Sequence, residues 1–161
     1  MPRQIKINTE FTVYDSLEEL KEQDKELLLL AKKTSENAYA PYSNFFVGAA
    51  VLLENGIIVT GNNQENAAYP SGLCAERVAV FHASSQYPGV KIKTIAVTAK
   101  SSKQIIRTPV PPCGGCRQSL SEYEVKFKSP VRVILSGQEG PVYISDSISN
   151  LLPLSFTAES L

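Results

Sequence analysis

The sequence has no excess of charge of either sign, because its lysines and arginines number 16 and its aspartates and glutamates also number 16. Domains that bind polynucleotides usually carry a net basic surface, since neutralising phosphates supplies most of their affinity. The chain also lacks a basic, aromatic-rich segment of the kind that binds single-stranded nucleic acid. We therefore expect a small-molecule ligand and no nucleic-acid partner, although a neutral chain leaves room for a local basic patch.

Long apolar runs are absent as well. No stretch approaches the roughly 20 apolar residues that span a bilayer, and the run from Leu27 to Ala31 is flanked by Glu26 and Lys32. The first residues do not show the basic-then-apolar layout of a secretory signal. Cysteine is scarce, and three cysteines cannot all pair in disulfides within one chain. We expect reduced thiols, a cytoplasmic location and no membrane contact.

The length of 161 residues fits one domain that is large enough to bury a core. A hydrophobic content of 43% and a charged content of 20% are ordinary for a globular protein. Apolar residues alternate loosely in residues 1–14, as at Ile5 and Ile7, which indicates an extra strand or a docked arm. We expect this N-terminal arm, residues 1–14, to precede a single domain over residues 15–161.

Helical and strand patterns alternate along that domain. Ser16 and Glu19 are spaced as a capping box, which predicts a helix over residues 17–39 that ends before Pro41. Asn55-Gly56 between two apolar runs is a strong hairpin signal. The alternation predicts an α/β fold with one sheet covered by helices. The expected strands are 46–53, 57–61, 92–99, 131–135 and 142–144, and the other expected helices are 75–83, 113–123 and 147–152.

The three cysteines, Cys74, Cys113 and Cys116, carry the strongest functional signal. Three thiolates can ligate a zinc ion and leave its fourth tetrahedral position open, as in catalytic sites. Glu76 lies two residues after Cys74, where it can carry a proton for a water that the zinc has activated. The pattern predicts a hydrolytic zinc enzyme with one zinc ion per chain. The alternatives are three buried cysteines, or a redox pair formed by Cys113 and Cys116.

Residues 74–77 read Cys-Ala-Glu-Arg, and residues 112–118 read Pro-Cys-Gly-Gly-Cys-Arg-Gln. This paired pattern resembles the cytidine deaminase family, in its branch with an all-cysteine zinc site and a glutamate that is not a ligand. The resemblance extends from about residue 38 to residue 156. It implies a three-layer α-β-α fold, with a mixed five-stranded sheet, helices on both faces, and the metal at two helix N-termini.

The resemblance also implies an activity and an assembly. The expected reaction is the zinc-dependent hydrolysis of free cytidine and 2′-deoxycytidine to uridine and 2′-deoxyuridine with release of ammonia, as in pyrimidine salvage. The expected assembly is a homotetramer with shared active sites. In it, Tyr69 and Phe156 match positions that reach a neighbouring subunit's site. The apolar residues from Leu151 to Phe156 agree with this, since an isolated chain would tend to expose them.

Further residues match the family's substrate-binding positions. Asn63 and Glu65 match its sugar-binding motif, and side chains two apart on an extended segment point the same way. Phe45 matches the position that contacts the pyrimidine ring, with Phe46 as the alternative for that contact and a core role as the alternative for Phe45. The peptide groups of Ala75 are suited to reading the edge of the base, as in the family. Gln64 departs from the pattern, because the family usually has an apolar residue at that position.

Two arginines flank the cysteines. Three thiolates and one Zn²⁺ leave a net negative charge, which would oppose ionisation of a bound water. Helix N-termini each offer about half a positive charge. We hypothesise that these termini, together with Arg77 and Arg117, draw negative charge off the sulfurs. Ordinary surface salt bridges are the alternative for both arginines.

Other functions fit the sequence less well. His82 lies eight positions after Cys74, roughly 12 Å along a helix axis, so we expect a packing or surface histidine and not a ligand. A non-catalytic zinc module would normally close its site with a fourth protein ligand, and none is visible. An enzyme acting on another cytosine compound, or one editing nucleic acid, remains an alternative that a substrate panel separates.

Overall fold

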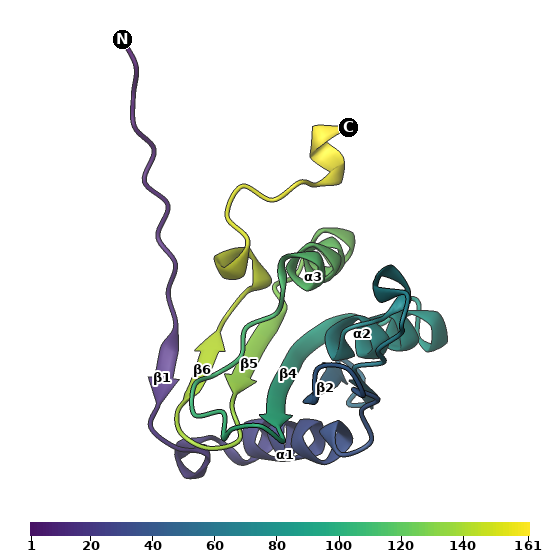
Figure 1. The fold of residues 1–161 in the computed structure, drawn as a ribbon. Coiled ribbons are helices and arrows are strands. Elements are labelled where there is room, and N and C mark those ends of the chain that lie inside the picture. The colour runs from purple at the N-terminus through teal and green to yellow at the C-terminus, as the bar shows by residue number, and fades with distance from the viewer.

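A six-stranded mixed sheet forms the centre of the computed structural model, which describes residues 1–161 (Figure 1). Its strand order is β1-β6-β5-β4-β2-β3. Only β4 and β5 are parallel neighbours, and every other pair is antiparallel. The strands are β1 (Thr12–Tyr14), β2 (Phe45–Leu53), β3 (Ile58–Asn62), β4 (Ile92–Ser101), β5 (Arg132–Ser136) and β6 (Val142–Ser145).

The expectation of five strands is therefore wrong by one. The sixth strand is β1, which pairs antiparallel with β6 through Thr12 opposite Ile144 and Tyr14 opposite Val142. Part of the N-terminal arm thus extends the sheet by one edge strand. Residues 1–11 are exposed, and the chain before β1 extends to an N-terminus far from the sheet (Figure 1), while Phe11 next to β1 still contacts Tyr143 on β6 at 6.3 Å between ring centroids.

Helices cover both faces of the sheet, as the α-β-α expectation requires. Helix α1 (Glu22–Ser35) packs on one face, and α2 (Ala75–Gln86) and α3 (Gly114–Phe127) pack on the other (Figure 1). Short 3₁₀ turns lie at Leu17–Glu19, Tyr69–Ser71, Ile148–Leu151 and Ala158–Ser160. None of the helices combines the length and apolarity needed to cross a membrane.

The central strands bury both of their faces, because successive side chains point to opposite sides of the sheet. Along β2, Val51 joins the core beneath α2 and α3, while Ala50 and Leu52 join the core beneath α1. Along β5, Val133 joins the core beneath α2 and α3, and Ile134 joins the core beneath α1. Each large side chain buried here contributes about 1.5–3 kcal/mol, which makes the sheet a rigid support for the loops at its ends.

The single helix expected over residues 17–39 is wrong at both ends. The backbone is extended at Leu20 and Lys21, so a 3₁₀ turn precedes α1, and Ser16 forms no side-chain cap. Leu20 is buried in the core beneath α1, which accounts for the break. At the other end, Tyr39 exchanges backbone hydrogen bonds with Asn63 (3.0 Å) and Glu65 (2.9 Å). This pairing takes Tyr39 out of the helix and brings the loop after it beside residues 63–65.

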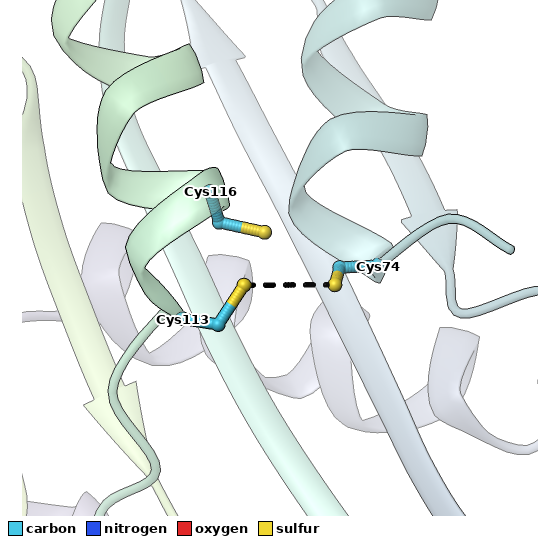
Figure 2. Close-up of side chains that lie close together, drawn as sticks. All are labelled: Cys74, Cys113 and Cys116. Carbon is cyan, nitrogen blue, oxygen red and sulfur yellow. Dashed lines mark hydrogen bonds between the residues drawn. The ribbon is translucent and has the colours of Figure 1, made fainter. Parts of the chain in front are cut away.

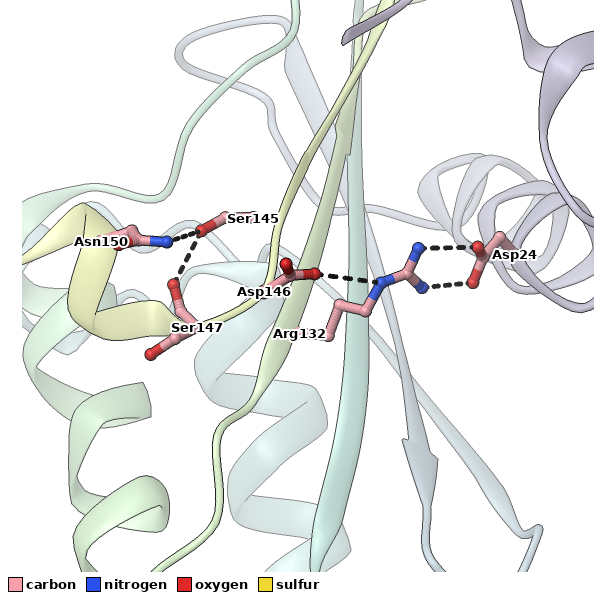
Figure 3. Close-up of polar contacts among 6 residues, drawn as sticks. All are labelled: Asp24, Arg132, Ser145, Asp146, Ser147 and Asn150. Atoms are coloured by element: carbon pink, nitrogen blue, oxygen red, sulfur yellow. Dashed lines mark hydrogen bonds and ion pairs between the residues drawn. The ribbon is translucent and has the colours of Figure 1, made fainter. Parts of the chain in front are cut away.

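An ion pair fixes α1 to the sheet. The Arg132 guanidinium on β5 donates to both carboxylate oxygens of Asp24 on α1, at 2.5 and 2.8 Å (Figure 3). Asp24 is buried, so the paired charges are largely shielded from water. Asp146 approaches the same arginine at 4.0 Å, but its side chain is 93% exposed and adds little.

A second polar cluster fixes the chain after β6. The Ser145 hydroxyl donates to the Ser147 carbonyl at 2.8 Å and accepts from the Asn150 amide at 3.1 Å (Figure 3). The Glu124 carboxylate on α3 accepts from the Ser147 hydroxyl at 2.8 Å and the Ile148 amide at 2.9 Å. These bonds hold the turn at residues 148–151 against α3, the helix that carries two of the cysteines.

Candidate metal centre and active site

The three cysteine sulfurs meet between the N-termini of two helices. Cys74 is the N-terminal cap of α2, Cys113 is the cap of α3, and Cys116 lies in the first turn of α3. The sulfurs all lie within 4.8 Å of one another, and those of Cys74 and Cys113 are 3.9 Å apart (Figure 2). Segments 39 positions apart in the sequence thus supply one cluster.

Close packing of α2 on β3 sets the position of Cys74. A Cβ atom at Gly61 on β3 would lie 2.5 Å from the Ala79 amide and 2.8 Å from the Ala75 carbonyl. Only glycine fits this contact without moving the helix. Gly61 therefore allows the first turn of α2, and Cys74 before it, to lie directly against the sheet.

The sulfur cluster fits a tetrahedral zinc ion. Zinc–sulfur bonds of about 2.3 Å at tetrahedral angles place sulfurs roughly 3.8 Å apart, close to the 3.9 Å between Cys74 and Cys113. The cluster contains no fourth histidine, cysteine or carboxylate ligand, and His82 is exposed on α2. A donor set of three thiols with one position left open is that of a catalytic zinc site, and not of a closed structural one.

The thiols influence one another's protonation. The pKa of Cys74 is lowered to about 5, mainly by a hydrogen bond from Cys116 and to a smaller extent by one from Arg77. The Nη2 atom of Arg77 lies 3.8 Å from the Cys74 sulfur. The pKa of Cys116 is raised, mainly by its hydrogen bond to Cys74 and to a smaller extent by burial. One thiolate is thus favoured while its neighbour keeps its proton. A divalent cation can take the place of such protons, because it stabilises all of the thiolates at once.

Glu76 lies in the first turn of α2 and is only 4% exposed. Burial is the main cause that raises the pKa of its carboxyl group, and the charge on Cys74 raises it further. A raised pKa makes the protonated form of this carboxyl group easier to reach, which suits a residue that takes up and passes on protons in general acid–base catalysis. Ala75, between Cys74 and Glu76, is fully buried.

The two arginines differ in their contacts. Arg77 reaches the Cys74 sulfur, and its Nε is buried without a hydrogen-bond partner. Arg117 instead donates from Nε to the Pro112 carbonyl and from Nη1 to the Leu151 carbonyl, each at 2.8 Å. Arg77 is therefore placed to act on the sulfurs directly, whereas Arg117 ties the loop before Cys113 to the C-terminal segment.

A cleft of about 730 Å³ opens beside the sulfur cluster. Of the residues singled out from the sequence, Ala75, Cys116, Arg117 and Phe156 are not in its wall. The wall joins a metal-binding end to a polar end that carries Asn63 and Glu65, a size and mixture typical of small-molecule sites. The singled-out residues that line it are Phe45, Asn63, Glu65, Tyr69, Cys74, Glu76, Arg77 and Cys113.

At the polar end, Asn63 and Glu65 bind the backbone of neighbouring segments. Asn63 accepts from the Val47 amide at 2.7 Å and donates to the Phe45 carbonyl at 2.9 Å. Glu65 accepts from the Tyr42 amide at 2.9 Å. Each side chain nevertheless keeps unused hydrogen-bonding capacity, and both line the cleft.

Two aromatic residues singled out from the sequence are far more exposed. Tyr69, in a 3₁₀ turn at the cleft, is 77% exposed and makes an edge-on contact with Tyr42 at 6.2 Å between ring centroids. Phe156, in the C-terminal segment, is 59% exposed, and its carbonyl accepts from Gln118 at 2.8 Å. Exposed aromatic rings of this kind suit contacts with another surface.

Residues 21–129 match the family model described as the cytidine and deoxycytidylate deaminase zinc-binding region. The chain belongs to the cytidine and deoxycytidylate deaminase family. The matched residues include α1, the lining of the cleft and all three cysteines, so the resemblance read from the sequence is confirmed.

Full-length relatives agree with the family match. The cytidine deaminase of Halalkalibacterium halodurans is 40% identical over 140 residues, which cover 86% of this chain and 98% of that protein. The cytidine deaminase of Sporosarcina psychrophila is 41% identical over 138 residues, covering 85% of this chain and 93% of that protein. The crystal structure of the Burkholderia pseudomallei cytidine deaminase superposes with a TM-score of 0.71 at 37% identity, covering 85% of this chain and all of that one.

Sequence reasoning missed part of this deaminase's cleft. Tyr42, Ser43, Leu73, Val97 and Pro111 also line it. Tyr42 and Ser43 stand just before Phe45, and Pro111 stands just before the second cysteine pair, so proximity to the motifs was an available signal. Val97 lies in the middle of a buried strand, where the sequence gives no sign that it faces a site.

Proposed function

We propose that this deaminase hydrolyses free cytidine and 2′-deoxycytidine to uridine and 2′-deoxyuridine, with release of ammonia, in pyrimidine salvage in the cytoplasm. One observation carries the proposal: a single cleft joins the sulfur cluster, the buried Glu76 and the polar pair Asn63 and Glu65. The relatives named as cytidine deaminases support the same substrate. We assign the catalysis to residues 15–161 and treat residues 1–14 as an arm.

Cys74, Cys113 and Cys116 would hold one zinc ion per chain. When bound, the ion supplies Lewis acidity that makes water a nucleophile at neutral pH. Arg77 donates a hydrogen bond to the Cys74 sulfur, and the N-termini of α2 and α3 face the cluster. These positive groups offset the excess negative charge of three thiolates.

Glu76 would carry the protons. Its carboxylate accepts a proton from the attacking water, whose oxygen adds to C4 of the ring, and delivers that proton to N3. It then passes the second water proton to the amino group, which leaves as ammonia while the C4 carbonyl of uridine forms. Burial of Glu76 supports this role, since it keeps solvent from exchanging with the proton in transit.

Phe45 and the peptide groups of Ala75 would hold the base, and Asn63 with Glu65 would hold the sugar. A carboxylate offers about four acceptor positions, and Glu65 already accepts from the Tyr42 amide, the Ser43 amide and the Ser43 hydroxyl. One acceptor position is left on Glu65, and one N–H is left on Asn63. Together they suit a single sugar hydroxyl, which supports the use of both ribose and deoxyribose. The carboxylate also disfavours a substrate phosphate.

A substrate panel tests the proposal. Ammonia release should be rapid with cytidine and 2′-deoxycytidine and should be slow or absent with cytosine, CMP and adenosine. Preference for cytosine or CMP would contradict the sugar assignment, and preference for adenosine would contradict the assignment of the base.

The sugar pair gives a mutational test. Replacing Asn63 or Glu65 with alanine should chiefly raise the KM for cytidine, because these residues contact the sugar and not the metal. The loss should be about 1–3 kcal/mol for each partner removed. Asn63→Ala should also lower thermal stability, since the side chain is buried and bonded to β2. Unchanged kinetics in both variants would refute the sugar assignment.

We further propose a homotetramer in which Tyr69 and Phe156 reach a neighbouring subunit's site. The C-terminal segment supports this, because Leu154 is 90% exposed and Phe156 is 59% exposed. Apolar side chains so exposed are stabilised when a second subunit covers them. Leu151, by contrast, is 6% exposed and belongs to the chain's own core.

Deleting residues 154–161 should therefore reduce assembly and cytidine turnover together. The cut leaves Leu151 and its bond to Arg117 in place, so the zinc site should stay intact. Turnover should fall about 10-fold or more, as expected when an aromatic interface residue is lost. Deleting only residues 158–161, which keeps Phe156, is the control. Light scattering that found an active monomer at the assay concentration would exclude the tetramer.

A further inference from the structure

The loop between α1 and β2 closes on the Glu65 carboxylate. The Tyr42 amide donates to Oε2 at 2.9 Å and the Ser43 amide donates to the same oxygen at 3.3 Å. The Ser43 hydroxyl donates to Oε1. These hydrogen bonds, with that of the Ser43 hydroxyl first, hold the pKa of Glu65 below its usual value. Ser43 is therefore the main partner of a carboxylate that lines the cleft.

The same hydroxyl is also joined to the aromatic wall of the cleft. Its oxygen accepts from the Phe45 amide at 3.0 Å, so one hydroxyl donates toward Glu65 and accepts from the strand that carries the ring. Asn63 holds that strand from the other side through the Phe45 carbonyl at 2.9 Å. The polar pair and the aromatic residue thus share one hydrogen-bonded unit, in which Ser43 is the link to Glu65.

The loop does not depend on Ser43 for its own shape. Asn44 adopts a left-handed conformation with φ of 57°, its amide bonds to the Ala40 carbonyl at 3.0 Å, and its carbonyl accepts from the Ser102 amide at 3.3 Å. These bonds are all to the backbone. Loss of the Ser43 hydroxyl should therefore leave the loop in place and free the Glu65 side chain, which has several rotatable bonds and much rotamer freedom to lose.

We propose that Ser43 is a positioning residue that orients Glu65 toward the sugar of the substrate and links it to the residue facing the base. The inference rests on the proposed function of the cleft and goes beyond it, because it assigns the orientation of the sugar-binding carboxylate to a hydroxyl outside the Asn63–Glu65 pair. Ser43 does not touch the reacting atoms. It restricts the carboxylate to the orientation in which its remaining acceptor position is open to the cleft.

Steady-state kinetics with two substrates test this role. Ser43→Ala should lower kcat/KM for cytidine about 10-fold or more, as expected for a hydrogen bond to a charged group. The loss should lie mainly in KM, because a sugar contact is made equally before and during the reaction. With 2′,3′-dideoxycytidine, which lacks the 2′- and 3′-hydroxyls and therefore the ring hydroxyl that we assign to Glu65, the variant should stay within about twofold of the wild type. Ser43→Thr keeps a hydroxyl and should restore most of the loss.

A double-mutant cycle with Glu65→Gln separates action through Glu65 from any other effect. Adding Ser43→Ala to Glu65→Gln should cost almost nothing further, since the oriented carboxylate is already gone. Ser85→Ala, an exposed serine on α2 outside the cleft, is the matched control and should match the wild type.

Two results would overturn the assignment of Ser43. One is that Ser43→Ala lowers kcat/KM equally for cytidine and for 2′,3′-dideoxycytidine. The other is that adding Ser43→Ala to Glu65→Gln lowers kcat/KM by as much as Ser43→Ala does in the wild type. Both would mean that the hydroxyl acts through Phe45 or through the fold. A wild-type enzyme that fails to deaminate cytidine is a different result, because it would overturn the proposed function and the role of Ser43 with it.

Discussion

Replacing Glu76 with glutamine should abolish deamination while leaving the zinc content unchanged. The amide has nearly the shape of a protonated carboxyl group, so the buried first turn of α2 should keep its packing. It cannot accept a proton from water or deliver one to N3. General acid–base groups typically contribute about 10²–10⁴-fold, and here one residue serves several transfers, so we expect a loss at the upper end of that range or beyond it.

The matched control is Glu122→Gln, the same change at an exposed position on α3. It should leave turnover as it is in the wild type. For both variants, Glu76→Gln and Glu122→Gln, turnover is measured from initial rates with cytidine, and zinc content is measured by metal analysis of the same samples. Turnover of about a third of the wild-type rate in fully zinc-loaded Glu76→Gln would show that another group carries the protons, since a general acid–base role requires a far larger loss.

Cys113→Ser should remove both the metal and the activity. Cys113 is the exposed member of the cluster, whereas Cys116 is fully buried. The change at Cys113 should therefore cost the fold little. It replaces a thiolate with a hydroxyl that stays protonated near neutral pH, which leaves two thiolate ligands. Zinc should fall from about one ion per chain to a small fraction after dialysis, and activity should fall with it.

His82→Ala is the control for the metal assignment, because His82 is the one histidine of the chain and is exposed on α2. This variant should keep its zinc and its activity. Elemental analysis that found wild-type turnover in zinc-free Cys113→Ser protein would contradict a thiolate zinc site. Loss of zinc from His82→Ala would point to a ligand set other than the three cysteines.

The strands and the two cysteine-bearing helices could be predicted from sequence because their signals are local. Continuous apolar runs mark β2 and β5, and the Asn55-Gly56 turn marks the hairpin between β2 and β3. The cysteine spacing predicted the metal end of the cleft, since ligand geometry restricts which residues can share an ion. The family resemblance supplied the polar end, which an Asn-x-Glu sequence alone would not have indicated.

The errors occurred where tertiary contacts outweigh local preference. The Ser16–Glu19 spacing favoured a helix from residue 17, but burial of Leu20 interrupts it. Edge pairing of β1 with β6 depends on a partner more than a hundred residues away, and three residues carry too little pattern to predict it. Arg117 follows Cys116 in the sequence as Arg77 follows the first cysteine motif, but only the structure shows that its hydrogen bonds go to two carbonyl groups. The contacts of Ser43 with Glu65 are invisible in sequence for the same reason.

The most direct test of the central claim compares metal-free and zinc-reconstituted wild-type protein on cytidine, with uridine and ammonia measured in the same reaction. We expect the metal-free protein to be inactive. Adding about one zinc ion per chain should restore turnover that yields uridine and ammonia in equal amounts. Equal activity without zinc, or zinc-loaded protein that leaves cytidine unchanged, would contradict the account.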